Sequence, residues 1–207
     1  MTVPVDLVLG RDVSRETAES LSFLAFKVRK WNSKINLVSK SSAADLMVRH
    51  IADSLQLVDL VSPNCEHWVD LGSGGGFPGL VIAIFSRESG YPQRLTLVES
   101  DVRKGVFLRE MVRELNLPVE VLNSRIEGLQ PLKADVVSAR ALAPLVQLCD
   151  FAYSHMLKDG IAIFPKGASY PDEIAEAQRR WRFQLSVTPS RTNANAGILT
   201  LREIEYA

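Results

Sequence analysis

The sequence predicts an α/β fold, with a mostly parallel Rossmann-like sheet, a terminal antiparallel hairpin and an N-terminal helical extension. Three observations support this prediction. A glycine-rich turn over residues 72–79 separates a short apolar strand from an apolar helix. Short apolar runs then alternate with helix-length segments, as in a parallel sheet. The last two apolar runs have no helix-length segment between them, which indicates an antiparallel pair.

Composition limits the classes of protein to consider. The chain has 207 residues, 46% apolar and 23% charged, which suits one globular domain with an appendage. Residues 1–6 do not resemble a signal peptide, and no apolar stretch approaches the ~20 residues of a membrane span. Cys65 and Cys149 are isolated, which favours buried thiols over a metal site. We expect a cytoplasmic protein without a metal, and nothing demands more than a monomer.

The first part of the chain, residues 1–66, is expected to be helical. Ser14 is the predicted N-cap of a first helix that ends near residue 33. A second helix is expected after Ser42, with Ser42 and Asp45 as a capping box, ending near Pro63. Its buried face is predicted to consist of apolar residues at helical spacing: Met47, Ile51, Leu55 and Val58.

Basic residues are concentrated in this extension. Between Leu24 and Arg49 the chain has one acid, Asp45, and these bases: Lys27, Arg29, Lys30, Lys34, Lys40 and Arg49. Such a cluster attracts phosphates, although a solvated helix face gives the same pattern. His50 and Asp53 are one helical turn apart, so they could orient each other at a site or simply form a pair.

Residues 67–207 are expected to form the main domain. Its parallel strands are predicted at residues 67–71, 95–99, 119–122, 134–138 and 160–164, and its antiparallel pair at 183–187 and 197–204. Helices are predicted to start near residue 80 and to span residues 101–116, 144–158 and 171–181.

The glycine turn allows two interpretations. Gly74, Gly76 and Gly79 have the spacing of a dinucleotide-binding loop, with an acid, Glu99, about twenty residues on. Asp70 two residues before Gly72 instead suits the first motif of S-adenosylmethionine-dependent methyltransferases. A carboxylate there would repel a pyrophosphate but could approach the methionine end of S-adenosylmethionine. In either case Glu99 is expected to accept hydrogen bonds from a ribose.

The terminal hairpin favours the methyltransferase interpretation. It is typical of the class I methyltransferase sheet and is not expected of a dinucleotide-binding domain. The chain also has no second domain to hold a hydride acceptor. We therefore predict a class I S-adenosylmethionine-dependent methyltransferase domain over residues 67–207.

Several short motifs indicate a resemblance that is narrower than the fold class. They are Trp31-Asn32 with Asn36-Leu37, Arg49-His50-x-x-Asp53-Ser54-Leu55, Gly76-Phe77-Pro78-Gly79, Ser124-Arg125-x-Glu127, Arg140-Ala141-x-Ala143 and Lys166-Gly167. Together they resemble the ribosomal small subunit methyltransferase G family, also called glucose-inhibited division protein B, which methylates guanine N7 in 16S rRNA. The Gly-Phe-Pro-Gly ending of the turn is far more specific than the glycines alone.

The resemblance implies S-adenosylmethionine as cofactor and 16S rRNA, or the small ribosomal subunit, as partner. The acceptor would be N7 of one guanosine in the decoding-region loop, conventionally numbered 527. Gly72 and Phe77 match positions that line the cofactor, and Ile126 and Glu127 match a pair that contacts its adenine. Arg140 matches a cofactor-site arginine near the methionine carboxylate or the incoming base. Three further candidates are predicted to bind the cofactor: Asp70, Gly74 and Glu99. Four are candidates for positioning the substrate: Arg49, His50, Asp53 and Lys166.

The implied chemistry needs no general base, because guanine N7 has a lone pair and no proton. The sequence accordingly offers no nucleophile–base–acid triad. The methylated guanine is positively charged, so a carboxylate such as Asp53 or Glu127 nearby would stabilise it. Three alternatives stay open: an NAD-dependent oxidoreductase, an rRNA-binding assembly factor without catalysis, and a methyltransferase for a protein or small molecule.

Overall fold

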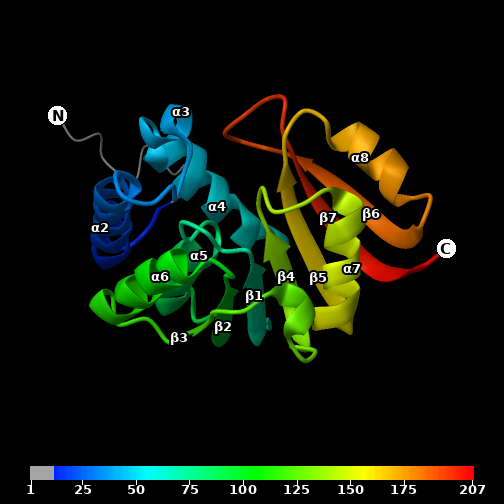
Figure 1. Cartoon of the computed structure of the whole chain (residues 1–207), viewed down its shortest axis with the longest axis horizontal. Coiled ribbons are helices and arrows are strands. Elements are labelled where there is room, and N and C mark those ends of the chain that lie inside the picture. The colour runs from blue at the N-terminus through cyan, green and yellow to red at the C-terminus, as the bar shows by residue number, and fades with distance from the viewer. Residues whose placement is uncertain (1–11) are drawn as a thin grey trace.

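The computed structural model describes residues 12–207, so the expectation for residues 1–6 lies outside the described part (Figure 1). A seven-stranded sheet has the order β3-β2-β1-β4-β5-β7-β6. The strands are β1 (His67–Leu71), β2 (Arg94–Val98), β3 (Val119–Leu122), β4 (Ala134–Ala139), β5 (Met156–Lys166), β6 (Trp181–Pro189) and β7 (Gly197–Tyr206). Strands β1 to β5 pair in parallel, and β7 is antiparallel to β5 and β6. The predicted fold class is confirmed.

Two hydrophobic cores lie on opposite faces of this sheet. Successive strand side chains point to opposite faces, and Trp68 and Val69 on β1 accordingly belong to different cores. Five helices of the described chain flank the sheet, in chain order α2 (Arg15–Asn32), α5 (Gly79–Ser89), α6 (Val102–Glu114), α7 (Leu145–His155) and α8 (Tyr170–Ala177), of which α2 packs on α5 and α8 packs on α7. The first three contribute buried side chains to one core, and the last two to the other. Cys65 and Cys149 are buried free thiols, as expected.

The second N-terminal segment differs from the single helix that the sequence predicts. It consists of α3 (Lys40–Ala43), a π-helical segment η1 (Met47–Ala52), α4 (Asp53–Leu55) and a 3₁₀ segment η2 (Gln56–Leu60). The predicted capping box is wrong. Ser39 is the N-cap, because its hydroxyl accepts a hydrogen bond from the amide of Ser42, which lies inside α3. By contrast, Ser14 caps α2 as predicted.

Four boundaries in the second half also need correction. Helix α7 ends at His155, and Asp159-Gly160 lies within β5 instead of ending the helix. The β4–β5 register shifts here, and a Cβ on Gly160 would lie 2.5 Å from Met156 Cγ, so this irregular strand leaves no room for a side chain. Helix α8 ends at Ala177, and the buried Trp181 begins β6.

The sheet order places one crevice at the carboxyl ends of the parallel strands. Strand β1 pairs with β2 on one side and with β4 on the other, so the chain crosses over in opposite directions from β1. Ligands of open α/β sheets bind at such a point. The glycine turn follows β1, Glu99 follows β2 and Arg140 follows β4, so all three are brought to this edge.

Candidate active site

The glycine turn leaves β1 in a conformation that favours glycine. Gly72 and Gly74 have φ of +64° and +55°, in the left-handed region. The backbone amide of Gly74 donates to Glu99 Oε2 at 2.8 Å, and Glu99 Oε1 accepts from the Asp101 amide at 2.8 Å. Glu99 thereby connects the turn to the start of α6. Glu99 is 7% exposed and lines a cavity.

Asp70 lies below the turn, and this corrects the expectation that its carboxylate approaches the cofactor. The side chain is fully buried, and it accepts hydrogen bonds from Ser138 Oγ at 2.7 Å and the Gly79 amide at 3.2 Å. Burial raises the pKa of Asp70 to about 6, although these hydrogen bonds oppose the shift. Asp70 therefore supports the turn from inside the protein and joins it to β4.

A cavity of about 320 Å³ adjoins the turn and contains four predicted cofactor residues: Gly72, Glu99, Ile126 and Glu127. Its volume is in the range of small-molecule sites. Ile126 and Glu127 reach it from a short 3₁₀ segment, η3 (Ile126–Gly128), after β3. The open glycine backbone, the acid after β2 and the side chains after β3 fit the parts of S-adenosylmethionine.

A second cavity, of about 740 Å³, contains the four substrate-positioning candidates and Arg140: Arg49, His50, Asp53, Arg140 and Lys166. Residues 141–143 line both cavities, and we call them the dividing segment. The structure thus separates the predicted residues into two adjoining groups. Phe77 is buried beside the second group, with its ring centroid 4.8 Å from that of His50.

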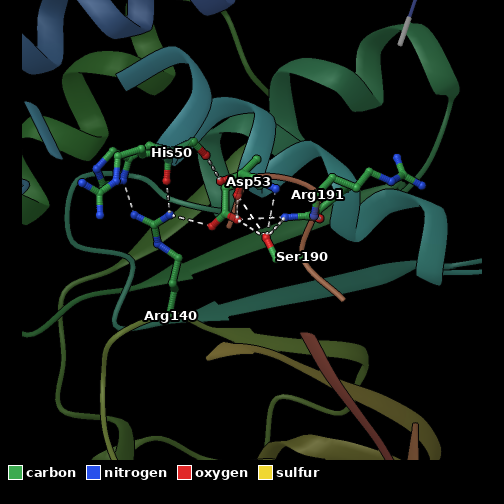
Figure 2. Close-up of polar contacts among 9 residues, drawn as sticks. His50, Asp53, Arg140, Ser190 and Arg191 are labelled. Carbon is green, nitrogen blue, oxygen red and sulfur yellow. Dashed lines mark hydrogen bonds and ion pairs between the residues drawn. The ribbon is translucent and has the colours of Figure 1, made fainter. Parts of the chain in front are cut away.

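Arg140 organises the polar contacts of the larger cavity (Figure 2). Its Nη1 donates to Asp53 Oδ2 and to the Arg49 carbonyl oxygen, both at 3.1 Å. Its Nη2 donates to His50 Nδ1, and its guanidinium carbon lies 5.8 Å from the Phe77 ring centroid. The residue after β4 therefore contacts η1, α4 and the end of the glycine turn.

His50 is neutral in this arrangement. Burial, with Arg140 and Arg49 nearby, lowers its pKa to about 3. A guanidinium can only donate, so Nδ1 is the acceptor and Nε2 bears the proton. His50 and Asp53 are brought together through Arg140, and the sequence did not indicate this intermediary.

Asp53 also contacts the loop between β6 and β7. Its Oδ1 accepts from Thr192 Oγ1 at 2.6 Å, from Gln56 Nε2 at 2.8 Å and from Ser190 Oγ at 3.4 Å (Figure 2). The Arg191 amide donates to Gln56 Oε1 at 3.0 Å. With Arg140 on the other oxygen, the Asp53 carboxylate is fully engaged, which leaves it little capacity to contact a methylated base directly.

Lys166, at the end of β5, is engaged by the protein rather than free. Its Nζ donates to the Ala143 carbonyl oxygen at 2.8 Å and to Glu173 Oε2 at 2.7 Å. Glu173, Ser190 and Thr192 were not predicted from the sequence. The one sequence signal for Glu173 is its position in the first turn of a helix just after a strand end.

The basic cluster of the extension is divided in the structure. Lys27 forms ion pairs with Glu110 at 2.9 Å and Glu114 at 2.8 Å on α6. Arg49 lines the larger cavity, and its guanidinium forms no hydrogen bond or ion pair with another residue among 12–207. Within the same described range, no helix could span a membrane and no group of acids, histidines and cysteines is arranged to hold a metal.

Comparison with known sequences gives one consistent family. Residues 17–198 match the family model described as rRNA small subunit methyltransferase G. A ribosomal RNA small subunit methyltransferase G of Cereibacter sphaeroides is 46% identical over 195 residues, covering 94% of this chain and 95% of the relative. One from Paramagnetospirillum magneticum is 45% identical over 201 residues, covering 97% and 96%.

Solved structures with similar folds include proteins named as methyltransferases. A putative O-methyltransferase from Klebsiella pneumoniae has a TM-score of 0.62 at 12% identity, and the match covers 96% of this chain and 95% of that chain. The ribosomal protein L11 methylase from Lactobacillus delbrueckii has a TM-score of 0.58 at 16% identity, covering 76% and 79%. At these identities the likeness concerns the fold alone.

Proposed function

This chain belongs to the rRNA small subunit methyltransferase G family, and from that premise we propose that it methylates N7 of one guanosine in the decoding-region loop of 16S rRNA, the position conventionally numbered 527. The coarser activity, S-adenosylmethionine-dependent methylation of small-subunit rRNA, follows from the family. The choice of N7 depends on the groups that surround the larger cavity.

The observation that supports N7 is that the groups at this cavity that could take up a proton, two carboxylates and one imidazole, are already engaged. The Asp53 carboxylate is paired with Arg140, Glu173 is paired with Lys166, and neutral His50 accepts from Arg140. None of these described groups is free to remove a proton. Methylation at an amino group or a hydroxyl requires proton removal, whereas guanine N7 attacks through a lone pair without one.

We assign the smaller cavity to S-adenosylmethionine, which supplies an electrophilic methyl group on a sulfonium sulfur. Gly72 and Gly74 would present backbone to it, Glu99 would accept from its ribose, and Ile126 and Glu127 would contact its adenine. Arg140 and Phe77 lie toward the larger cavity, near the methionine end in this assignment. Asp70 would act only by holding the turn in place.

We assign the larger cavity to the guanosine and its flanking phosphates. Arg49 is the cation at this cavity that is free of other described residues, so it is the natural phosphate contact. A loop base can be unstacked and enter a pocket at small cost. Catalysis then depends on alignment of N7 with the methyl group, which contributes up to about 7–11 kcal/mol in favourable cases.

The site of methylation can be tested in cells. A strain that lacks this chain is complemented with the wild type or with Arg140→Gln, and its 16S rRNA is treated with borohydride and aniline, which cleave at N7-methylated guanosine. We expect one cleavage in the decoding-region loop with the wild type and none with the variant. Methylation of 16S rRNA without this cleavage would refute the choice of N7.

A further inference from the structure

The dividing segment is held in an unfavourable backbone conformation. Ala141 has φ of +51°, in the left-handed region, which costs an alanine roughly 1–2 kcal/mol. Leu142 lies against the glycine turn, since a Cβ on Gly72 would be 2.5 Å from Leu142 Cδ1. A strained conformation persists only where neighbouring contacts determine it. The contacts on both sides of the segment therefore decide the shape of the boundary between the cavities.

One side of the dividing segment is held by Arg140, and the other side by a pair of residues from β5 and α8. Lys166 Nζ donates to the Ala143 carbonyl oxygen at 2.8 Å. Glu173 Oε2 accepts both from Lys166 Nζ at 2.7 Å and from the Leu145 amide at 2.9 Å. Pro144, which lies between Ala143 and Leu145, has no amide hydrogen to donate. One carboxylate oxygen of Glu173 thus determines the position of the chain on both sides of Pro144.

We propose that Glu173 is a positioning residue for methyl transfer, acting through Lys166 and the Leu145 amide on the dividing segment. The inference rests on the proposed function, because the methyl group has to pass between the two cavities at this segment. In this proposal Lys166 links Glu173 to the Ala143 carbonyl oxygen and does not contact the substrate directly. Since alignment errors of about 1 Å can cost 10²-fold in rate, loss of this support reduces turnover.

The test compares Glu173→Leu with Glu173→Gln. A glutamine oxygen can take the place of Oε2 and accept both hydrogen bonds, while its amide group faces Ser169 Oγ, now 3.5 Å from Oε1. Leucine accepts neither bond. Glu176→Leu is the matched control, because Glu176 lies on the same helix and its carboxylate pairs, within residues 12–207, only with exposed Arg179. The readouts are kcat and KM with small subunits, and hydrogen exchange of the amides at residues 140–145.

We expect Glu173→Leu to lower kcat about 10- to 100-fold with KM for subunits changed less than about 3-fold. Exchange at residues 140–145 is expected to be faster in this variant, and Glu173→Gln and Glu176→Leu are expected to resemble the wild type. Lys166→Met should lower kcat similarly, and the double variant Lys166→Met with Glu173→Leu should be no worse than either single one, because both act through one contact.

The inference is overturned if exchange at residues 140–145 does not change in Glu173→Leu, or if the loss in both variants is confined to KM. A KM effect would mean that Lys166 binds the substrate itself. If Glu173→Leu does not fold, the same measurements of kcat, KM and hydrogen exchange on Lys166→Met decide the question. Failure of the proposed function is a separate result, seen as a wild-type protein that transfers no methyl group to N7, while the exchange measurement still decides the role of Glu173.

Discussion

Arg140 joins three groups at the larger cavity. Its guanidinium donates to a carboxylate, a carbonyl oxygen and an imidazole from two other segments of the chain. Lysine has the same charge but a compact ammonium group, which cannot reproduce this planar set of donors.

We therefore expect Arg140→Lys to lower the single-turnover rate of methyl transfer about 10²-fold, although the charge is retained. Arg179→Lys, at an exposed position on the protein, is the control and should have no effect. A rate for Arg140→Lys within about 2-fold of the wild type would show that charge alone is sufficient.

Asp70 gives a prediction on stability. Its pKa is raised to about 6 in the folded protein from the ordinary value of 3.8 for an aspartate, so folding favours the protonated form. This contribution to stability is fully present below about pH 3.8 and is lost as the pH rises through about 6. Relative to Asp70→Asn, the wild type should lose on the order of 2 kcal/mol of unfolding free energy between pH 4 and pH 7.

Urea unfolding of both proteins at pH 4 and pH 7 measures this difference. Equal changes in unfolding free energy for wild type and Asp70→Asn would contradict the assignment of a buried, partly protonated Asp70.

For individual residues, the sequence predicted which side chains gather but not always how they act. The glycine turn at Gly72 and the acid Glu99 were predictable because they follow the carboxyl ends of adjacent parallel strands, whereas Ile126 was implied by the family resemblance. The burial of Asp70 was not, because the depth of a side chain below a turn depends on the packing of α5 against β1. Glu173 was missed because its partners are fixed only by the fold.

Among the elements, the loop between β6 and β7 is attached to the N-terminal helices. Thr192 Oγ1 donates to Asp53, and Arg191 Nη1 forms an ion pair with Asp59 at 2.8 Å. The terminal hairpin thus forms one side of the larger cavity. The sequence predicted the hairpin itself from the missing helix, but contacts between residues more than a hundred positions apart leave no local pattern.

Thr192→Val should lower the unfolding free energy by roughly 2 kcal/mol, because it removes a hydrogen bond to a charged acceptor without changing the side-chain shape. Thr188→Val on β6 is the control, since its hydroxyl makes no hydrogen bond to another residue in the described range. Chemical denaturation measures both. An unchanged midpoint for Thr192→Val would mean that the loop is not held through Asp53.

The helices of the N-terminal extension use their basic residues in two ways. Lys27 joins α2 to α6, whereas Arg49 on η1 faces the larger cavity. π-Helical segments are rare in proteins, and those that occur often lie at functional sites. Side chains on η1 therefore point in other directions than they would on a regular α-helix. The sequence predicted a helix here but had no signal for the irregular turn.

Arg49→Gln should weaken binding to small subunits and reduce the salt dependence of the binding constant by about one unit of slope. Lys27→Gln should change neither by a comparable amount. Titrations at several salt concentrations measure both variants. The same loss for both would indicate a diffuse basic surface instead of a specific phosphate contact at Arg49.

For the whole molecule, the extension and the sheet form a common core. Buried residues of α2, such as Leu21 and Leu24, belong to the same hydrophobic cluster as Trp68 on β1 and Leu80 on α5. The division into residues 1–66 and 67–207 stays a prediction, and we propose that it separates roles along the chain rather than units that fold alone. The overall α/β architecture was predictable because alternating strands and helices allow few topologies.

We propose that a cofactor and a guanosine bind in two adjoining cavities of this one protein. The most direct measurement is transfer of labelled methyl groups from S-adenosylmethionine to small subunits from cells that lack this chain, followed by mapping of the label. We predict label at N7 of one guanosine in the decoding-region loop of 16S rRNA. Label at another atom, at another position or in a ribosomal protein would contradict the account.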